Sequence, residues 1–108
     1  MFVGGDLAEA LKLPSSGGLL IQHVVEGSAA DRAGLRGANN VVLAGNYRLG
    51  IGGDLIVAID GKSVEEEDAI TRILARKHAG DAMDVRLIRN GKTMDVKVTL
   101  TEAPEERL

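Results

Sequence analysis

The chain has 108 residues, 44% of them apolar, and a formal net charge of −3. This length suits one domain with a small core. The weak acidity argues against nucleic acid as the main partner, because no excess of lysine and arginine is present to displace counterions, and an aromatic content of 2% leaves almost no rings for base stacking. The absence of cysteine excludes disulfides and thiolate metal sites, and no apolar run approaches the ~18 residues of a membrane span.

The first two predicted elements are a helical turn and a strand. Residues 6–14, DLAEALKLP, have the composition of a brief helical turn, and Pro14 ends it. Residues 17–25, GGLLIQHVV, are rich in branched apolar side chains and predict a strand.

A second short helix is predicted in the stretch GSAADRAGL. Ser28 is a suitable N-cap with Asp31 three residues later, and Gly34 is a suitable C-terminal stop. Residues 36–53 follow as a long, polar and glycine-rich loop.

The next segment, GIGGDLIVAIDGKS, ends in Gly-Lys-Ser, as phosphate-binding loops do. Such a loop requires a glycine five positions before Gly61, where Ile56 stands. The nearest candidate, Gly53, is separated from Gly61 by DLIVAID, an apolar run that predicts a buried strand over 54–60. Backbone N–H groups engaged in a sheet do not converge on a phosphate, so we interpret Asp60-Gly61 as a turn.

A longer helix is predicted from the stretch SVEEEDAITRILARKHAG. Ser63 and Glu66 have the spacing of a capping box, and acidic residues gather at this end. Basic residues gather at the other end, and Gly80 stops the helix.

The apolar residues of this helix form two neighbouring stripes. Ile70, Ile73 and Leu74 have i, i+3, i+4 spacing, and Ala69 with Ile73 makes the second stripe. Either one stripe packs on a sheet while the other faces a groove, or both belong to a single broad core face.

The final predicted element is a hairpin over 83–100 with the turn Asn90-Gly91, because both residues tolerate the positive φ of a two-residue turn. This turn sets the register, which pairs Arg89 with Lys92, Leu87 with Met94, Val85 with Val96, Met83 with Val98, Arg86 with Asp95 and Asp84 with Lys97. Apolar residues face apolar residues and opposite charges face each other, as stable cross-strand pairing requires.

This order of elements predicts a mainly β fold with two helices (α+β). We expect a partly open barrel or sandwich of five or six strands, capped by helices. The single domain spans residues 1–101, and residues 102–108 form a charged, flexible tail.

Catalytic chemistry finds no support in the sequence. None of the serines has the glycine-framed motif of a hydrolase nucleophile, and Ser28 and Ser63 already have capping roles. The acidic run 65–68 fits a solvated helix N-terminus, and His23 and His78 lie far apart in the chain. We therefore expect a non-catalytic chain that needs no metal or cofactor.

Taken together, the elements resemble the PDZ domain of bacterial HtrA/Deg-family serine proteases. The residues that carry the resemblance are LAEALKLPSSGGLLIQHVVEGSAADRAGL, GGDLIVAIDGKSV, DAITRIL, Gly-Asp and the Arg-Asn-Gly-Lys hairpin, which together span roughly residues 7–100. The resemblance implies a module that binds C-terminal or extended peptides by adding them as a strand to a sheet edge, for substrate recognition and protease regulation. It also implies an attached protease domain and a periplasmic or cell-envelope location.

The resemblance also implies where the peptide lies. Phe2-Val3-Gly4-Gly5 matches the loop whose N–H groups hold the peptide carboxylate, although Gly5 stands where a branched apolar residue is usual. The longer helix forms the other wall, with Ala69 and Ile73 toward the groove and Ile70 and Leu74 toward the core. Site residues at the rim are Arg76 and Lys77, which would meet a carboxylate. We expect an apolar C-terminal ligand residue.

Alternative readings differ in what the domain binds and in its parent enzyme. The domain could hold subunits of an oligomer together without binding substrate, or belong to a site-2 or C-terminal processing protease. The tail ends in Leu108, so self-binding of this apolar terminus in a neighbouring molecule's groove is a further hypothesis.

Overall fold

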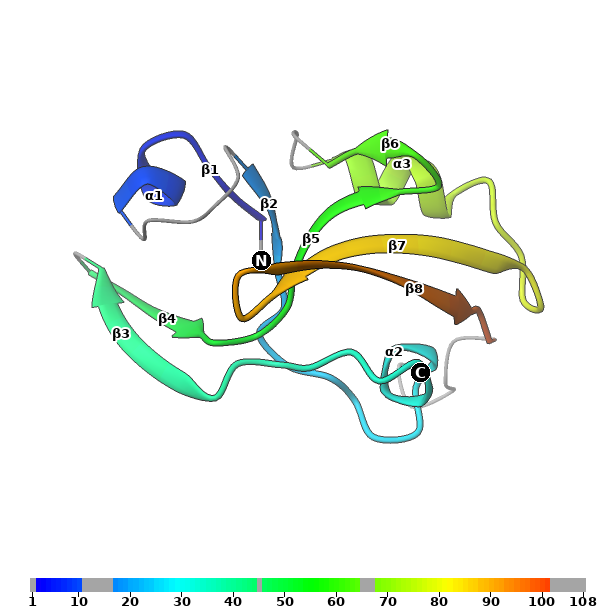
Figure 1. The fold of residues 1–108 in the computed structure, drawn as a ribbon, viewed down its shortest axis with the longest axis horizontal. Helices are drawn as coiled ribbons and strands as arrows, with labels where there is room; N and C mark the ends of the chain where they lie inside the picture. Colours follow the sequence, from blue (N-terminus) through cyan, green and yellow to red (C-terminus); the bar gives the residue numbers. More distant parts are fainter. Residues whose placement is uncertain (1, 11–16, 45, 65–67, 102–108) are drawn as a thin grey trace.

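The computed structural model describes residues 2–10, 17–44, 46–64 and 68–101. Its elements in chain order are β1 (Phe2–Gly4), α1 (Gly5–Ala10), β2 (Gly17–Leu20), α2 (Ala29–Arg32), β3 (Asn40–Ala44), β4 (Tyr47–Ile51), β5 (Leu55–Ile59), β6 (Lys62–Ser63), α3 (Ala69–Leu74), β7 (Ala82–Arg89) and β8 (Lys92–Thr99) (Figure 1). The predicted predominance of strands is confirmed. The predicted helical turn forms α1, so the described residues contain three short helices.

The strands form two open sheets. One has the order β1-β2-β5-β7-β8, with β6 also paired to β5, and the other contains β3 and β4 alone. All of these pairings are antiparallel. The six-stranded sheet is open at both ends and does not close into a barrel, in agreement with the partly open architecture expected from the sequence.

The β7–β8 hairpin has the predicted register throughout, from Arg89 opposite Lys92 to Met83 opposite Val98. Asn90 and Gly91 have φ values of 52° and 78°, as a two-residue turn of this type requires. The apolar face of the hairpin lies on the core.

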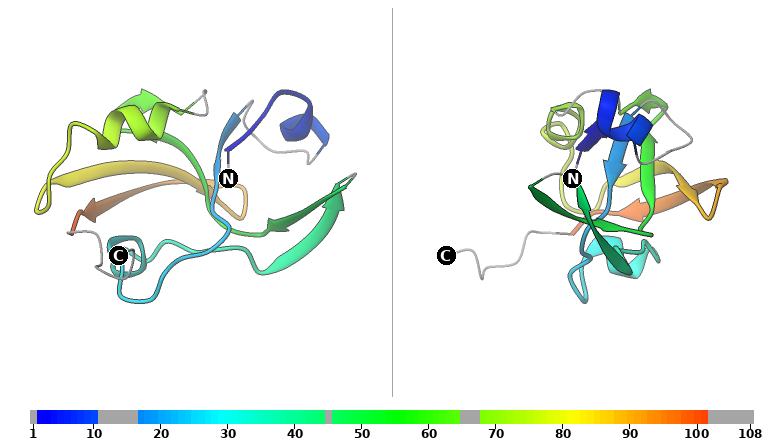
Figure 2. Two further views of the ribbon diagram at one scale, coloured as in Figure 1. Left: turned by 180° about the vertical axis from the view of Figure 1, so that it is seen from behind. Right: turned by 90° about the vertical axis from the view of Figure 1, so that its left-hand side faces the viewer.

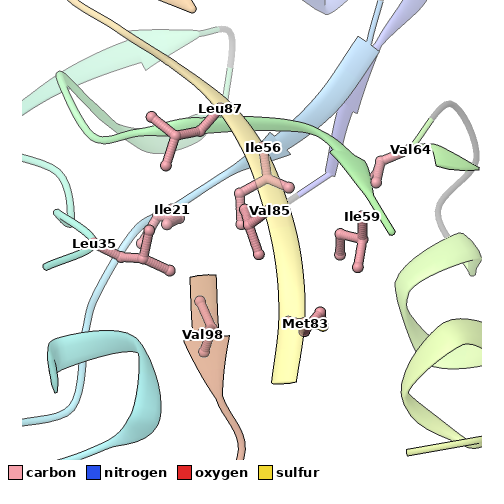
Figure 3. Packing of buried hydrophobic residues seen from close by; sticks show 9 residues of the cluster. All are labelled: Ile21, Leu35, Ile56, Ile59, Val64, Met83, Val85, Leu87 and Val98. Carbon is pink, nitrogen blue, oxygen red and sulfur yellow. The ribbon is translucent and has the colours of Figure 1, made fainter. Parts of the chain in front are cut away.

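The main core lies against β5 and β7, where branched side chains from distant segments meet (Figure 3). Its buried members are Ile21, Leu35, Ile56, Ile59, Val64, Met83, Val85, Leu87 and Val98. The strand predicted at 54–60 is therefore confirmed as a buried central strand, with Ile59 only 1% exposed.

The predicted cap of α2 is also confirmed. The hydroxyl of Ser28 accepts a hydrogen bond from the N–H of Asp31 at 3.2 Å. Gly34 follows the helix with a φ of 85°, a conformation that favours glycine.

The loop predicted over 36–53 is wrong in part, because it contains the β3–β4 hairpin. Its residues pair from Asn40 opposite Ile51 to Ala44 opposite Tyr47. The side chains of this hairpin alternate between two faces, as strands require: Leu49 on one face is 1% exposed, whereas Leu43 on the other face is 78% exposed. The predicted strand over 17–25 is too long, since β2 ends at Leu20.

The start of the long helix is wrong as well. Ser63 lies in β6, opposite Ala58, and α3 begins at Ala69. The turn at Asp60-Gly61 explains this, because it folds the chain back onto β5 before a helix can start. Ser63 therefore caps no helix, and Glu66 lies outside the described residues.

The end of that helix also differs from the prediction. α3 ends at Leu74, well before Gly80. Ile70 packs against the core as predicted, whereas Leu74 is 40% exposed and does not. Ile73, which was predicted to face a groove, also packs against the core. Pro14 and the tail 102–108 lie outside the described residues.

Candidate functional site

Strand β1 forms one end of the six-stranded sheet. Phe2, Val3 and Gly4 pair with Leu19, Gly18 and Gly17 of β2. Among the described strands β2 is the sole neighbour of β1, so its other edge is open to a further strand.

The side chains of β1 anchor this edge to the domain. Val3 is 1% exposed and packs with Leu20 and Leu55, while Phe2 packs against the main core. Gly5 has a φ of 51° and begins α1, which turns the chain away from the sheet. Buried neighbours therefore anchor this edge strand to the domain.

The four residues predicted on the longer helix lie together. Ala69, Ile73, Arg76 and Lys77 line a surface pocket, which also contains Arg72 and, from the β5–β6 turn and β6, Asp60, Lys62 and Ser63. None of the β1 residues lines this pocket. The structure thus groups the predicted residues into two sets, one at the edge of β1 and one between α3 and β6.

The two predicted cations at the rim have different surroundings. The ammonium group of Lys77 lies 2.6 Å from the carboxylate of Asp60 and donates to the carbonyl of Ala82 at 3.2 Å. The hydrogen bond between Lys77 and Asp60 raises the pKa of Lys77 and lowers the pKa of Asp60. Arg76 is exposed, and no hydrogen bond or ion pair joins it to another described side chain. Of the two, Arg76 has its charge available to a ligand.

A buried ion pair joins the residue just before β5 to the last residue of β7, and it was not predicted from the sequence. Asp54 is 1% exposed, and its carboxylate accepts hydrogen bonds from Arg89 Nε at 2.8 Å and Arg89 Nη2 at 2.7 Å. It also accepts the N–H of Arg36 at 2.9 Å, while Arg89 donates to the carbonyl of Gly34 at 2.9 Å.

Burial of Asp54 opposes its ionisation, but the hydrogen bonds from Arg89 and from the N–H of Arg36 outweigh this effect and lower its pKa. The one sequence signal was an acid directly before an apolar strand. Its partner, 35 residues away, was not evident from local patterns.

The sequence profile of the PDZ domain family matches residues 6–100. The chain belongs to the PDZ domain family. The strand-rich PDZ-like fold predicted from the sequence is thereby confirmed.

Curated relatives place this PDZ domain in the HtrA/Deg type. The chain is 33% identical over 104 residues to a "probable periplasmic serine endoprotease DegP-like" of Chlamydia trachomatis, covering 96% of this chain and 18% of the relative. A protein of the same description from a Marinomonas species is 29% identical, with 96% and 19% covered. The chain thus spans about a fifth of the length of the curated relatives that it matches.

Solved structures show the same fold. The HtrA-type protease AlgW, solved with a decapeptide, superposes with a TM-score of 0.68 at 21% identity, over 96% of this PDZ domain and 27% of that chain. An aminopeptidase N family protein from Idiomarina loihiensis has a TM-score of 0.63 at 28% identity, with 81% and 12% covered. In the described part of the domain, no helix is long and apolar enough to cross a membrane.

Proposed function

We propose that this PDZ domain binds C-terminal or extended peptide segments by strand addition, and that it recognises substrates for, and regulates, an HtrA-like serine protease. The observation that carries the proposal is the open edge of β1, since a peptide needs unpaired backbone groups with which to form a ladder. Phe2, Val3 and Gly4 form this edge, and Gly5 follows it at the start of α1.

The second wall of the site is α3, with Ala69 and Ile73 as apolar contacts and Arg76 and Lys77 at the rim. Arg76 is the better candidate to meet the peptide carboxylate, because Lys77 already contacts Asp60. The preferred last ligand residue is apolar, since Ala69 and Ile73, the proposed pocket contacts, carry no charge.

The parent protein joins this domain to a protease domain and works in the periplasm. Support comes from the names of the relatives, which are periplasmic serine endoproteases of the DegP-like type. The chain itself is non-catalytic, so the purified domain should not hydrolyse casein. A serine-protease motif encoded in the same gene tests the link to the protease.

Peptide binding is tested by NMR titration of the isotopically labelled chain with a peptide library of random C-termini. We expect Val, Leu, Ile, Phe or Ala at the last position of the binders, and slower amide exchange at residues 2–4 when they bind. Preference for Asp or Lys there would refute the apolar pocket. Saturable binding that leaves residues 2–4 unchanged would refute strand addition at β1.

Two matched variants and a modified peptide test the rim. Arg76→Glu should weaken binding at least about fivefold, whereas Arg32→Glu, on exposed α2, should leave it unchanged. A peptide with an amidated C-terminus should bind more weakly than its free acid. Equal binding of the two peptides would show that internal extended segments, rather than C-termini, are recognised.

A further inference from the structure

The β3–β4 hairpin stands apart from the rest of the domain. It forms a two-stranded sheet of its own, and Figures 1 and 2 show it extending away from the six-stranded sheet. A two-stranded sheet is marginally stable in water unless further strands or a helix support it. This hairpin is therefore a place where additional pairing would stabilise the fold.

The two faces of the hairpin differ in exposure. Leu49 lies opposite Val42 and is 1% exposed, so this face is turned inward. On the other face Val41 is 52% exposed and Leu43 is 78% exposed. The outward face thus presents two neighbouring apolar side chains of β3 to solvent, on a strand that has no charged residue and no proline, and Arg48 of β4 lies beside them, opposite Leu43.

The two edges of the hairpin differ as well. At the edge of β4, the side-chain amide of Gln22 accepts the N–H of Gly50 and donates to its carbonyl, both at 2.8 Å. Gly50 is opposite Val41 in the register. Because the backbone groups of Gly50 point away from β3, this pair is a non-hydrogen-bonded one, and the backbone groups of Val41 and Leu43 point outward from β3.

The open edge of β3 has little to cover it. Within the described residues β3 pairs with β4 alone, and the N–H of Val41 is held by the neighbouring side chain of Asn40 at 2.8 Å. The charges and proline with which proteins usually protect an edge strand are absent from Asn40–Ala44.

We propose that this edge is a self-association site, at which β3 of one copy pairs antiparallel with β3 of a second copy. With the two copies of Val42 facing each other, Val41 of each copy lies opposite Leu43 of the other copy. The two exposed apolar residues of the strand therefore pair with each other. Both of these residues have outward backbone groups, so each pair exchanges two hydrogen bonds once the N–H of Val41 is released from the side chain of Asn40. The two hairpins become one sheet, in which Val41 and Leu43 of both copies form a central apolar stripe bordered by Arg48 of each copy. The pairing does not depend on peptide binding at β1.

Sedimentation of the 108-residue chain over a concentration series tests the proposal. The interface is small, so we expect a dimer with a Kd on the order of 10⁻⁴ M. Leu43→Lys should weaken it at least about tenfold, because it places a charge in the apolar face. Leu43→Val keeps an apolar strand former and should retain the dimer, and Val25→Lys, at an exposed valine outside the hairpin, should not affect it.

Cysteine cross-linking tests the register. The chain has no cysteine, so Val42→Cys introduces a single thiol. Two such residues across the axis would have Cα atoms about 4.5 Å apart, within the range of a disulfide. We expect Val42→Cys to form a disulfide dimer under mild oxidation faster than Val25→Cys does.

Circular dichroism of each variant establishes that it is folded. A wild-type chain that stays monomeric to about 1 mM would overturn the proposal, since that lies well above the expected Kd. A dimer that Leu43→Lys leaves intact, or a Val42→Cys chain that cross-links no faster than Val25→Cys, would overturn it as well.

Discussion

Replacing Asp54 with alanine should destabilise the PDZ domain more than any comparable change at a surface ion pair. Asp54 is 1% exposed and its partner Arg89 has a side chain that is 16% exposed. The substitution leaves the guanidinium of Arg89 with the carbonyl of Gly34 alone, and it also deprives the N–H of Arg36 of its acceptor.

The size of the effect follows from this geometry. Removing one partner of a buried ion pair costs about 3–5 kcal/mol, because the remaining charge is left without compensation. Since Arg89 retains some contact with solvent, we expect the lower end, about 3 kcal/mol. For a domain of this size, that loss corresponds to a fall in Tm of about 10–20 °C.

Urea denaturation measures the change in the free energy of unfolding. Far-UV circular dichroism is the probe, because the chain has no tryptophan whose fluorescence could report unfolding. The matched control is Asp95→Ala, whose partner Arg86 lies at a similar 2.9 Å but whose pair is exposed to water. The reasoning is refuted if Asp54→Ala lowers stability no more than Asp95→Ala does. The double variant Asp54→Ala/Arg89→Met should be more stable than Asp54→Ala, since it removes the unpaired charge.

Two further predictions concern pH and backbone packing. The pKa of Asp54 is lowered in the folded state, so the stability that its carboxylate provides is present above the unfolded pKa of about 4 and is lost as pH falls below it. In acid titrations followed by circular dichroism, the free energy of unfolding should therefore fall more steeply with pH for the wild type than for Asp54→Ala. Equal slopes would contradict this prediction. Gly50→Ala places a Cβ 2.6 Å from Ala38 Cβ and 2.8 Å from Gln22 Oε1, and should cost about 1–3 kcal/mol in urea denaturation. Gly17→Ala, where the atom nearest to the added Cβ is 3.3 Å away, should lower the free energy of unfolding by less. A larger loss for Gly17→Ala would show that the β3–β4 hairpin shifts to accommodate the added methyl group.

Local patterns were sufficient to predict elements whose geometry is set within a few residues. The turn Asn90-Gly91 determines the register of β7 and β8 by counting alone, so every pair along the hairpin was predicted correctly. The cap of α2 depends on Ser28 and Asp31, which are neighbours in the chain. The apolar run of β5 required burial whatever its partners were.

Features that depend on distant partners were not predictable in this way. The start of α3 depends on β6 returning to pair with β5, which takes Ser63 out of the helix. Within the glycine-rich stretch that contains the β3–β4 hairpin, Gly50 closely approaches Gln22, a residue 28 positions away. Composition does not distinguish a glycine that permits a close approach within a strand from a glycine in a loop, so the glycine content of this stretch indicated a loop.

The predicted binding residues show the same limit. The edge of β1 and the surface of α3 were chosen by family resemblance, and the sequence does not indicate which face of a short helix is turned toward which strand. Ala69 and Ile73 lie beside β6, whereas Leu74 is exposed. Position on a helix depends on where it begins, and that was set by the β6 pairing.

The amide of Gln22 has a consequence for the number of copies that can assemble. A sheet built from two hairpins joined through β3 still has β4 at each outer margin, and an unprotected margin would recruit further strands into an open ribbon. At Gly50 that margin is already occupied by a side chain that donates and accepts as a neighbouring strand would. In the proposed dimer Gln22 would therefore block strand addition at Gly50, which favours closure at two copies over propagation.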